Sequence, residues 1–297
     1  MTSRTRLAAA LGLFALLSVV AAASLSAAER FEQGLLWRVE GKGAPASHVF
    51  GTIHLADPRV TSLPPAVASA LDQARSLTLE AIFEPNSVLG LASRMVYSDG
   101  RDLPGVAGAE LFTKAARLTA ALGMPEPVLR AFKPWAVAML LSVPPQNPAE
   151  VLDFVLARIA LEQGKPVHDL ESLEEQVSVF EGLPADDQLT LLRQAVDDYQ
   201  RMPHLIGRVV EAYLKRDLAA IRRIGEESRG GGEEARRLRE VFTRRLLHDR
   251  NIRMAERAEP RLNEGGAFIA VGALHLQGER GVLALIERRG WRVTRVY

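Results

Sequence analysis

The hydrophobic positions divide this chain into two similar units near its ends and a long helical middle. The first unit has an apolar run at 48–53, a helix-like stretch at 64–74 and a second apolar run at 76–82. The second unit repeats this order at 269–272, 279–289 and 291–296. Each unit predicts strand, helix, strand, and a crossover of this kind makes a parallel pair of strands.

The first strand of each unit ends in the same motif, Gly-x-x-His-Leu. The motifs are Gly51-Thr52-Ile53-His54 and Gly272-Ala273-Leu274-His275, each followed by leucine. Loops in this position lie at the carboxyl edge of the sheet, where open α/β sheets bind ligands. A lone histidine there can simply cap a loop, but the repeated glycine favours a site, because glycine lets the backbone approach a ligand closely. We therefore expect His54 and His275 to converge on one site.

The remaining pattern completes an α/β fold. Residues 35–40 predict a strand that forms a hairpin with 48–53 through the turn Gly41-Lys42-Gly43. Apolar residues then recur at helical spacing, interrupted by one short predicted strand at 167–170. Pro260 is expected to end a long helix at 234–258. The sequence thus predicts one central sheet completed by both ends of the chain, with a largely helical insertion at about 87–260.

The composition excludes several classes of protein. The chain has 297 residues, of which 47% are hydrophobic and 25% charged, as in ordinary globular proteins. It has no cysteine, which excludes disulfides, thiol enzymes, cysteine-ligated metals and attachment of lipid through cysteine. The formal net charge is only +1, so neither nucleic acid nor an anionic membrane surface is an expected partner.

Residues 1–28 have the features of a secretory signal peptide. Arg4 and Arg6 form a positive start, 7–23 is apolar and uncharged, and Ser26-Ala27-Ala28 supplies small residues before a cleavage point. The mature protein is therefore expected to be one domain, 29–297, in the periplasm or outside the cell. The alternative is an uncleaved anchor, with 7–23 held in the inner membrane.

Four segments resemble the TraB/GumN family, which is related to PrgY and to the animal Tiki proteins. They are Leu36–Gly43, Phe50–His54 and Val271–His275, together with Gly290-Trp291-Arg292-Val293, and the resemblance extends over about 34–297. It implies an α/β fold similar to erythromycin-esterase-like and ChaN-like proteins. Tiki proteins are described as metal-dependent proteases of secreted signalling proteins, and PrgY-type proteins dampen peptide pheromone signals. The bacterial GumN-like members are largely unassigned.

The resemblance also implies site residues. His54 and His275 match the two motif histidines, and Glu80 matches an acidic residue at the end of the next strand. Arg250 matches a basic residue on the helix before the second motif, and Glu171 lies where relatives have Leu-Glu-Thr. The implied metal ligands are His54, His275 and Glu80, and the implied catalytic residues are Glu80, Arg250 and Glu171.

The residue types point to the same chemistry. Two imidazoles with one or two carboxylates suit Zn, Mn, Fe or Co and leave an open position for water. A bound metal lowers the pKa of that water, a free carboxylate takes its proton, and an arginine stabilises an oxyanion. Neither the His-Glu-x-x-His helix of common zinc proteases nor a Gly-x-Ser-x-Gly elbow is present.

The expected function is therefore an exported metal-dependent hydrolase, most simply a peptidase, acting on a peptide or protein. The alternative is a non-catalytic module that binds a peptide or small ligand in the same cleft.

Single residues have alternatives too. Glu80 could pair with an arginine, Arg250 could form a surface ion pair, and Glu171 could be a charge favoured at a helix start. Asp57 could be a metal ligand on the loop or could cap the turn. His168 could contact the site residues without binding the metal itself.

Overall fold

The computed structural model describes residues 31–82, 85–227 and 233–297, so the predicted signal peptide lies outside the described residues. Six strands form one sheet in the order β4-β3-β5-β2-β1-β6. Their bounds are Leu36–Gly41 (β1), Ala44–Thr52 (β2), Ser76–Leu79 (β3), Val167–Asp169 (β4), Ala267–Gly272 (β5) and Arg292–Arg295 (β6). The predicted α/β class is confirmed.

The two predicted units interleave in the sheet. Strands β2 and β3 run parallel, as do β5 and β6, but neither pair is adjacent. Strand β5 lies between β2 and β3, and both β2 and β1 lie between β5 and β6. The two strands of each unit thus have the predicted parallel direction. Their neighbours in the sheet could not be predicted, since a crossover fixes the direction of the strands and not which strands lie side by side. The predicted hairpin of β1 and β2 is confirmed. In the β2–β5 pair, Gly51 lies opposite Val271 and Thr52 opposite Gly272, so the two motifs emerge side by side.

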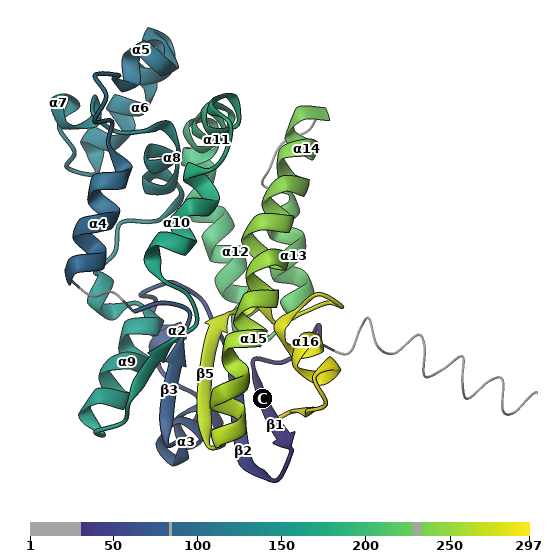
Figure 1. Cartoon of the computed structure of the whole chain (residues 1–297). Helices are drawn as coiled ribbons and strands as arrows, with labels where there is room; N and C mark the ends of the chain where they lie inside the picture. Colours follow the sequence, from purple (N-terminus) through teal and green to yellow (C-terminus); the bar gives the residue numbers. More distant parts are fainter. Residues whose placement is uncertain (1–30, 83–84, 228–232) are drawn as a thin grey trace, which may run out of the picture.

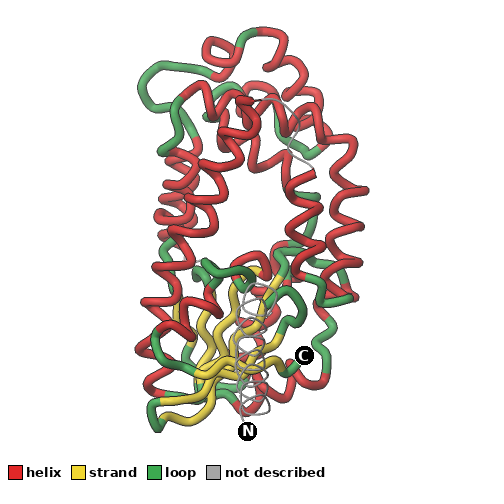
Figure 2. The backbone as a smooth tube through the Cα atoms, turned by 90° about the vertical axis from the view of Figure 1, so that its right-hand side faces the viewer, coloured by secondary structure: helices red, strands yellow, loops and turns green. Residues whose placement is uncertain are grey.

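Helices cover both faces of the sheet and extend beyond its carboxyl edge (Figures 1 and 2). Their bounds are Pro58–Thr61 (α2), Pro65–Gln73 (α3), Pro85–Met95 (α4), Leu103–Ala107 (α5), Ala109–Ala121 (α6), Glu126–Leu129 (α7), Pro134–Ser142 (α8), Leu152–Glu162 (α9), Leu173–Glu181 (α10), Ala185–Asp198 (α11), Met202–Leu214 (α12), Leu218–Glu227 (α13), Glu233–Phe242 (α14), Asp249–Glu264 (α15) and Val282–Arg288 (α16). Short 3₁₀ turns are Pro148–Glu150, Tyr199–Arg201 and Ala273–His275.

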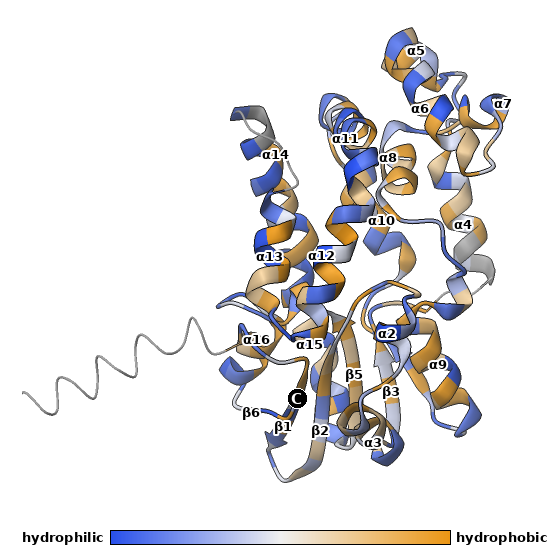
Figure 3. Ribbon diagram, turned by 180° about the vertical axis from the view of Figure 1, so that it is seen from behind, coloured by the Kyte–Doolittle hydropathy of each residue, from blue (hydrophilic) through white to orange (hydrophobic). Residues whose placement is uncertain are grey.

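The main core lies between the sheet and the helices on its two faces. Figure 1 shows α15 and α16 in front of the sheet, and Figure 3, drawn from behind, shows α3 over the opposite face. Val49, Leu77, Phe268 and Ile269 on the central strands are fully buried, as expected for a sheet covered on both sides. None of the helices in the described part of the chain is long and apolar enough to cross a membrane.

The long helix predicted at 234–258 is interrupted and then continues past its expected end. A π-helical segment, Thr243–His248, joins α14 to α15. Pro260 lies inside α15, which ends only at Glu264, so the prediction that Pro260 stops the helix was wrong. A proline removes one intrahelical hydrogen bond. Here Ala258 and Leu262 are buried against the sheet, and this packing keeps the last turn in place.

Replacing Gly51 by alanine should destabilise the protein. A Cβ atom there would lie 2.7 Å from Leu276 Cδ1 and 3.2 Å from Ala273 Cα, and overpacking of this kind typically costs about 1–3 kcal/mol. Gly207→Ala is the control, because a Cβ atom at this exposed helical position meets nothing within 4 Å. Urea unfolding should show a loss for Gly51→Ala and no loss for Gly207→Ala. Equal stabilities would contradict the close approach of the two motif loops.

Candidate functional site

A cleft of about 300 Å³ opens at the carboxyl edge of β2, β3 and β5. Its floor is made by the two motif loops and the residues that end these strands. Its walls come from α12, α13, the π-helical segment and α15. The lining residues are Thr52, Ile53, His54, Glu80, Val209, Tyr213, Ile221, Phe242, Thr243, Leu246, Leu247, Arg250, Gly272, Ala273, Leu274 and His275.

Gly272 lies where the polar groups of the cleft meet. A methyl group on its Cα would lie 3.2 Å from Glu80 Oε1, 3.5 Å from His275 Cδ2 and 3.7 Å from His54 Nε2. The structure thus brings the histidines of both motifs and Glu80 around one point. The absence of a side chain at Gly272 keeps that point open, which explains physically why the motif has a glycine at this position.

A carboxylate fixes the orientation of His54. Its Nδ1 lies 2.8 Å from Asp153 Oδ2, and Thr52 Oγ1 donates a hydrogen bond to the other oxygen of Asp153. Because a carboxylate only accepts, Nδ1 carries the proton and Nε2 is left for the cleft. Partial loss of hydration opposes a charged ring, but the hydrogen bond and the charge of Asp153 outweigh it and raise the pKa of His54 to about 9. The side chain of His54 is 61% exposed to solvent.

An amide fixes His275 in the same way. Asn251 Nδ2 donates to the carbonyl of Arg280, so its Oδ1 faces His275 Nδ1 at 2.6 Å and accepts the proton there. The Nε2 atom lies 3.6 Å from Glu80 Oε1. Burial is the main cause that lowers the pKa of His275 to about 4; Glu80 opposes this shift, and the positive charge of Arg250 adds to it. His275 is therefore neutral at pH 7.

Glu80 is a buried carboxylate held by several partners. It follows β3 directly, and it accepts hydrogen bonds from Arg250 Nη2 and from the backbone N–H of Gly272. Burial alone would raise its pKa, but the neighbouring His275, Arg250 and His54 together with the Gly272 N–H lower the pKa of Glu80 to about 2. Glu80 stays ionised across the physiological range.

Arg250 joins Glu80 to Glu171. Its Nε atom donates to Glu171 Oε2 at 2.7 Å, and Arg253 donates to the other oxygen of Glu171. The side chain of Arg250 is only 10% exposed, so the alternative of a surface ion pair was wrong. Glu171 is fully buried and does not line the cleft. Its carboxylate therefore lies behind Arg250 and positions that guanidinium.

The predicted metal ligands lie close together without forming a ready site. In residues 31–82, 85–227 and 233–297, no group of three or more His, Asp or Glu side chains is arranged to hold a metal ion. The reason is visible at Glu80, whose oxygens face Arg250 and Gly272. Metal binding by His54, His275 and Glu80 stays a prediction.

The two weaker candidates lie outside the cleft. Asp57 caps α2 by accepting the backbone N–H of Arg59, whose guanidinium it also pairs with. Its role is thus the cap, which was the alternative to a ligand. His168 on β4 contacts Arg261 and is absent from the lining of the cleft.

Sequence reasoning missed the residues that orient the histidines. Asp153 lies in the first turn of α9 and Asn251 directly follows Arg250, but neither belongs to a repeated motif. Tyr213, on α12, donates its hydroxyl hydrogen bond to the carbonyl of Gly51 and also lines the cleft. These contacts join segments that are far apart in sequence, so no local spacing signals them.

His275 should lower the free energy of unfolding as the pH falls from 7 to 5. Its pKa is about 4 in the folded protein and about 6.5 in an unfolded chain. Its contribution is therefore complete above pH 6.5 and is lost as the pH falls towards 4, by up to about 1.4 kcal/mol per pH unit. Urea unfolding in a chelator at pH 7 and pH 5 should show a smaller difference for His275→Gln than for wild type. The exposed control His204→Gln should keep the wild-type difference, and identical differences for all three proteins would contradict the assignment.

Comparison with known proteins identifies the family. The profile of the TraB/PrgY/gumN family matches residues 35–295. A similar protein from Shigella flexneri, described as uncharacterized protein YbaP, is 22% identical over 245 residues, which cover 78% of this chain and 84% of the relative. No solved structure matches the chain significantly. Because the family match spans both Gly-x-x-His motifs and almost everything between the ends, the chain belongs to the TraB/PrgY/gumN family.

Proposed function

We propose that this protein is an exported metal-dependent hydrolase that cleaves peptides or proteins in the cleft at Gly272. One observation carries the proposal. Two histidines from opposite ends of the chain each use Nδ1 to bind a fixed acceptor, so each has its Nε2 atom on the side of the cleft, close to a buried carboxylate and a buried guanidinium. Metal-binding histidines are typically oriented by an acceptor on the other ring nitrogen.

The donor types fit a divalent transition metal such as Mn, Co, Zn or Fe. His54 and His275 would hold it through Nε2, with Glu80 as the third ligand. When bound, such an ion lowers the pKa of a water molecule and polarises a carbonyl group. Because the pKa of His54 is raised to about 9, a metal has to displace a proton from this ring. Affinity should therefore rise as the pH increases from 6 to 9.

The other residues of the cleft have separate roles in this proposal. Arg250 lines the cleft and is held on its far side by Glu171. Its guanidinium would stabilise negative charge on the oxygen of a scissile carbonyl, or bind a substrate carboxylate. Glu80 is ionised, so it can act as a ligand or accept a proton from water. Glu171 does not reach the cleft and acts only through Arg250.

Export is part of the proposal and is supported by the sequence of residues 1–28, with its positive start, apolar segment and small residues at the end. An exported hydrolase of this kind would meet peptides and proteins of the periplasm or the surroundings of the cell.

The two motif histidines should be required together for metal and for activity. Protein stripped with a chelator and titrated with Mn, Co, Zn or Fe should bind about one equivalent of one ion, because two imidazoles and one carboxylate form a single set. His54→Ala and His275→Ala should each abolish this binding and peptide hydrolysis, and His204→Ala should retain both. Wild-type protein that binds peptide without metal and without turnover would contradict the proposal and favour the non-catalytic binding module.

Arg250 should be required for turnover and Arg253 should not. Both arginines bind Glu171, but only Arg250 also binds Glu80 and lines the cleft. Arg250→Lys keeps the charge and loses the planar donor geometry, so kcat should fall on the order of a hundredfold, as for loss of one oxyanion donor.

The matched variant Arg253→Lys should keep kcat within about twofold, a change far below that donor-sized loss. Circular dichroism would show that both variants are folded, and their metal content would show that both have bound the metal ion. If the two variants have equal kcat values, the oxyanion assignment of Arg250 is wrong.

A further inference from the structure

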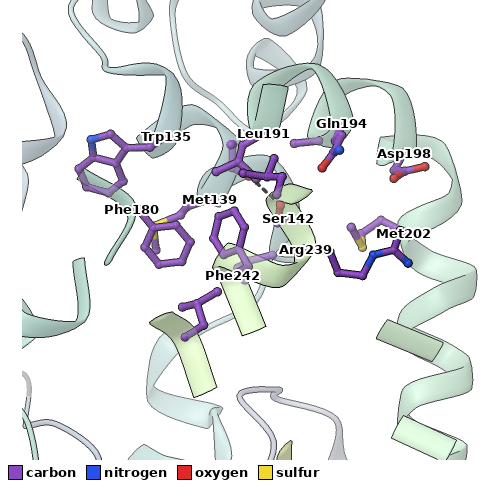
Figure 4. A pocket seen from close by; sticks show the side chains of 15 residues that line it. Trp135, Met139, Ser142, Phe180, Leu191, Gln194, Asp198, Met202, Arg239 and Phe242 are labelled. Atoms are coloured by element: carbon purple, nitrogen blue, oxygen red, sulfur yellow. Dashed lines mark hydrogen bonds between the residues drawn. The ribbon is translucent and has the colours of Figure 1, made fainter. Parts of the chain in front are cut away.

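A second cavity, of about 350 Å³, lies among the helices beyond the sheet edge. Figure 4 shows Trp135, Met139 and Phe180 at one end of it, with Leu191 and Phe242 in the middle. Gln194, Asp198 and Arg239 are grouped at the opposite end (Figure 4). The cavity is therefore apolar over most of its length and polar at one end.

This cavity lies where three small hydrophobic clusters meet. One cluster contains Trp135, a second contains Ala195, and a third contains Leu238 and Phe242, and all four residues line the cavity. Protein interiors normally fill such a junction with side chains at close-packed density. Here a volume in the range of small-molecule and substrate sites, ~300–1,000 Å³, is left open. Val143 on its wall is 49% exposed, so the wall reaches the molecular surface at this residue.

The cavity adjoins the cleft at Gly272. Phe242 and Leu246 line both spaces. They lie four residues apart, at the end of α14 and in the π-helical segment Thr243–His248. Segments of π-helix inside α-helices occur frequently at functional sites. The side chains of Phe242 and Leu246 therefore form the boundary between the two spaces, and a ligand group that extends from Gly272 past this boundary would enter the second cavity.

We propose that this cavity is the specificity subsite of the hydrolase and that it receives a bulky apolar side chain of a peptide substrate, of the leucine, methionine or phenylalanine type. This inference rests on the proposed function. The aromatic end and Met139 supply adaptable apolar walls. Substrates with glycine, alanine or a charged residue at this position would leave the apolar walls uncovered and be cleaved more slowly.

The test uses tryptophan variants that fill the cavity and measures the sequence preference of peptide cleavage. Ser142 is an exposed residue of α8 on the cavity wall, and Gln194 is a half-buried residue of α11 on the same wall. Ser142→Trp and Gln194→Trp should each block the space. Arg193→Trp is the control, because Arg193 is exposed, neighbours Gln194 and does not line the cavity. Near-ultraviolet circular dichroism would identify the variants that fold as the wild type does.

Each protein is incubated with a pool of random peptides, and the products are sequenced by mass spectrometry. Wild type and Arg193→Trp should enrich bulky apolar residues at one fixed position relative to the cleaved bond. The filled variants should cleave these peptides at least tenfold more slowly and lose the enrichment. Cleavage by the wild type without an apolar preference, or an unchanged preference in a folded filled variant, would overturn the subsite.

A second readout separates failure of the subsite from failure of the proposed function. If the wild type cleaves no peptide, the hydrolase proposal fails, and titration with the apolar dye 1-anilinonaphthalene-8-sulfonate then tests the cavity by itself. Binding that is at least tenfold weaker in Ser142→Trp than in Arg193→Trp would support an apolar ligand site. Equal binding by the two variants would overturn it.

Discussion

The parallel pairing of β2 with β5 in the middle of the sheet is the constraint on which the rest of the structure depends. It joins segments such as Ser47 and Ala267, which are 220 residues apart. Its register places Thr52 opposite Gly272, so that the two histidine loops leave the sheet side by side. The helical stretch between the two motifs is thereby closed into one large loop that rises from the carboxyl edge and returns to it.

Close to this strand pair, buried basic and acidic side chains alternate along one chain of contacts. Glu80 lies between the imidazole of His275 and the guanidinium of Arg250, and Glu171 lies on the far side of Arg250. Removing a buried carboxylate or arginine from water is costly unless each group finds partners. Here every member has at least one, and Arg253 completes the chain at the edge. The result is a cleft whose polar groups are already oriented, which is the condition that the proposed hydrolase would need for electrostatic catalysis.

The sequence predicted the repeated motif, the α/β class and the strands that carry the site, because strands and loops leave local periodic patterns. It did not predict that β5 lies between β2 and β3, since neighbour order depends on the whole sheet. Arg250 resembled its neighbours on an arginine-rich helix, and its burial became visible only with the fold. Asp153 and Asn251 were missed for a related reason, because a hydrogen bond between side chains such as His54 and Asp153, 99 residues apart, has no signature in spacing.

The long-range closure of the sheet has a consequence for biosynthesis. The hairpin of β1 and β2 can form early, because its residues are close in sequence, but the other edge of β2 has no partner until β5 has been made. Folds dominated by such distant pairings fold slowly, and their open strand edges promote aggregation. The nascent chain therefore has neither the cleft nor the paired histidines until β5 and the second motif have been made. In the exported hydrolase that we propose, this order would keep the chain unfinished until it reaches the compartment where it works.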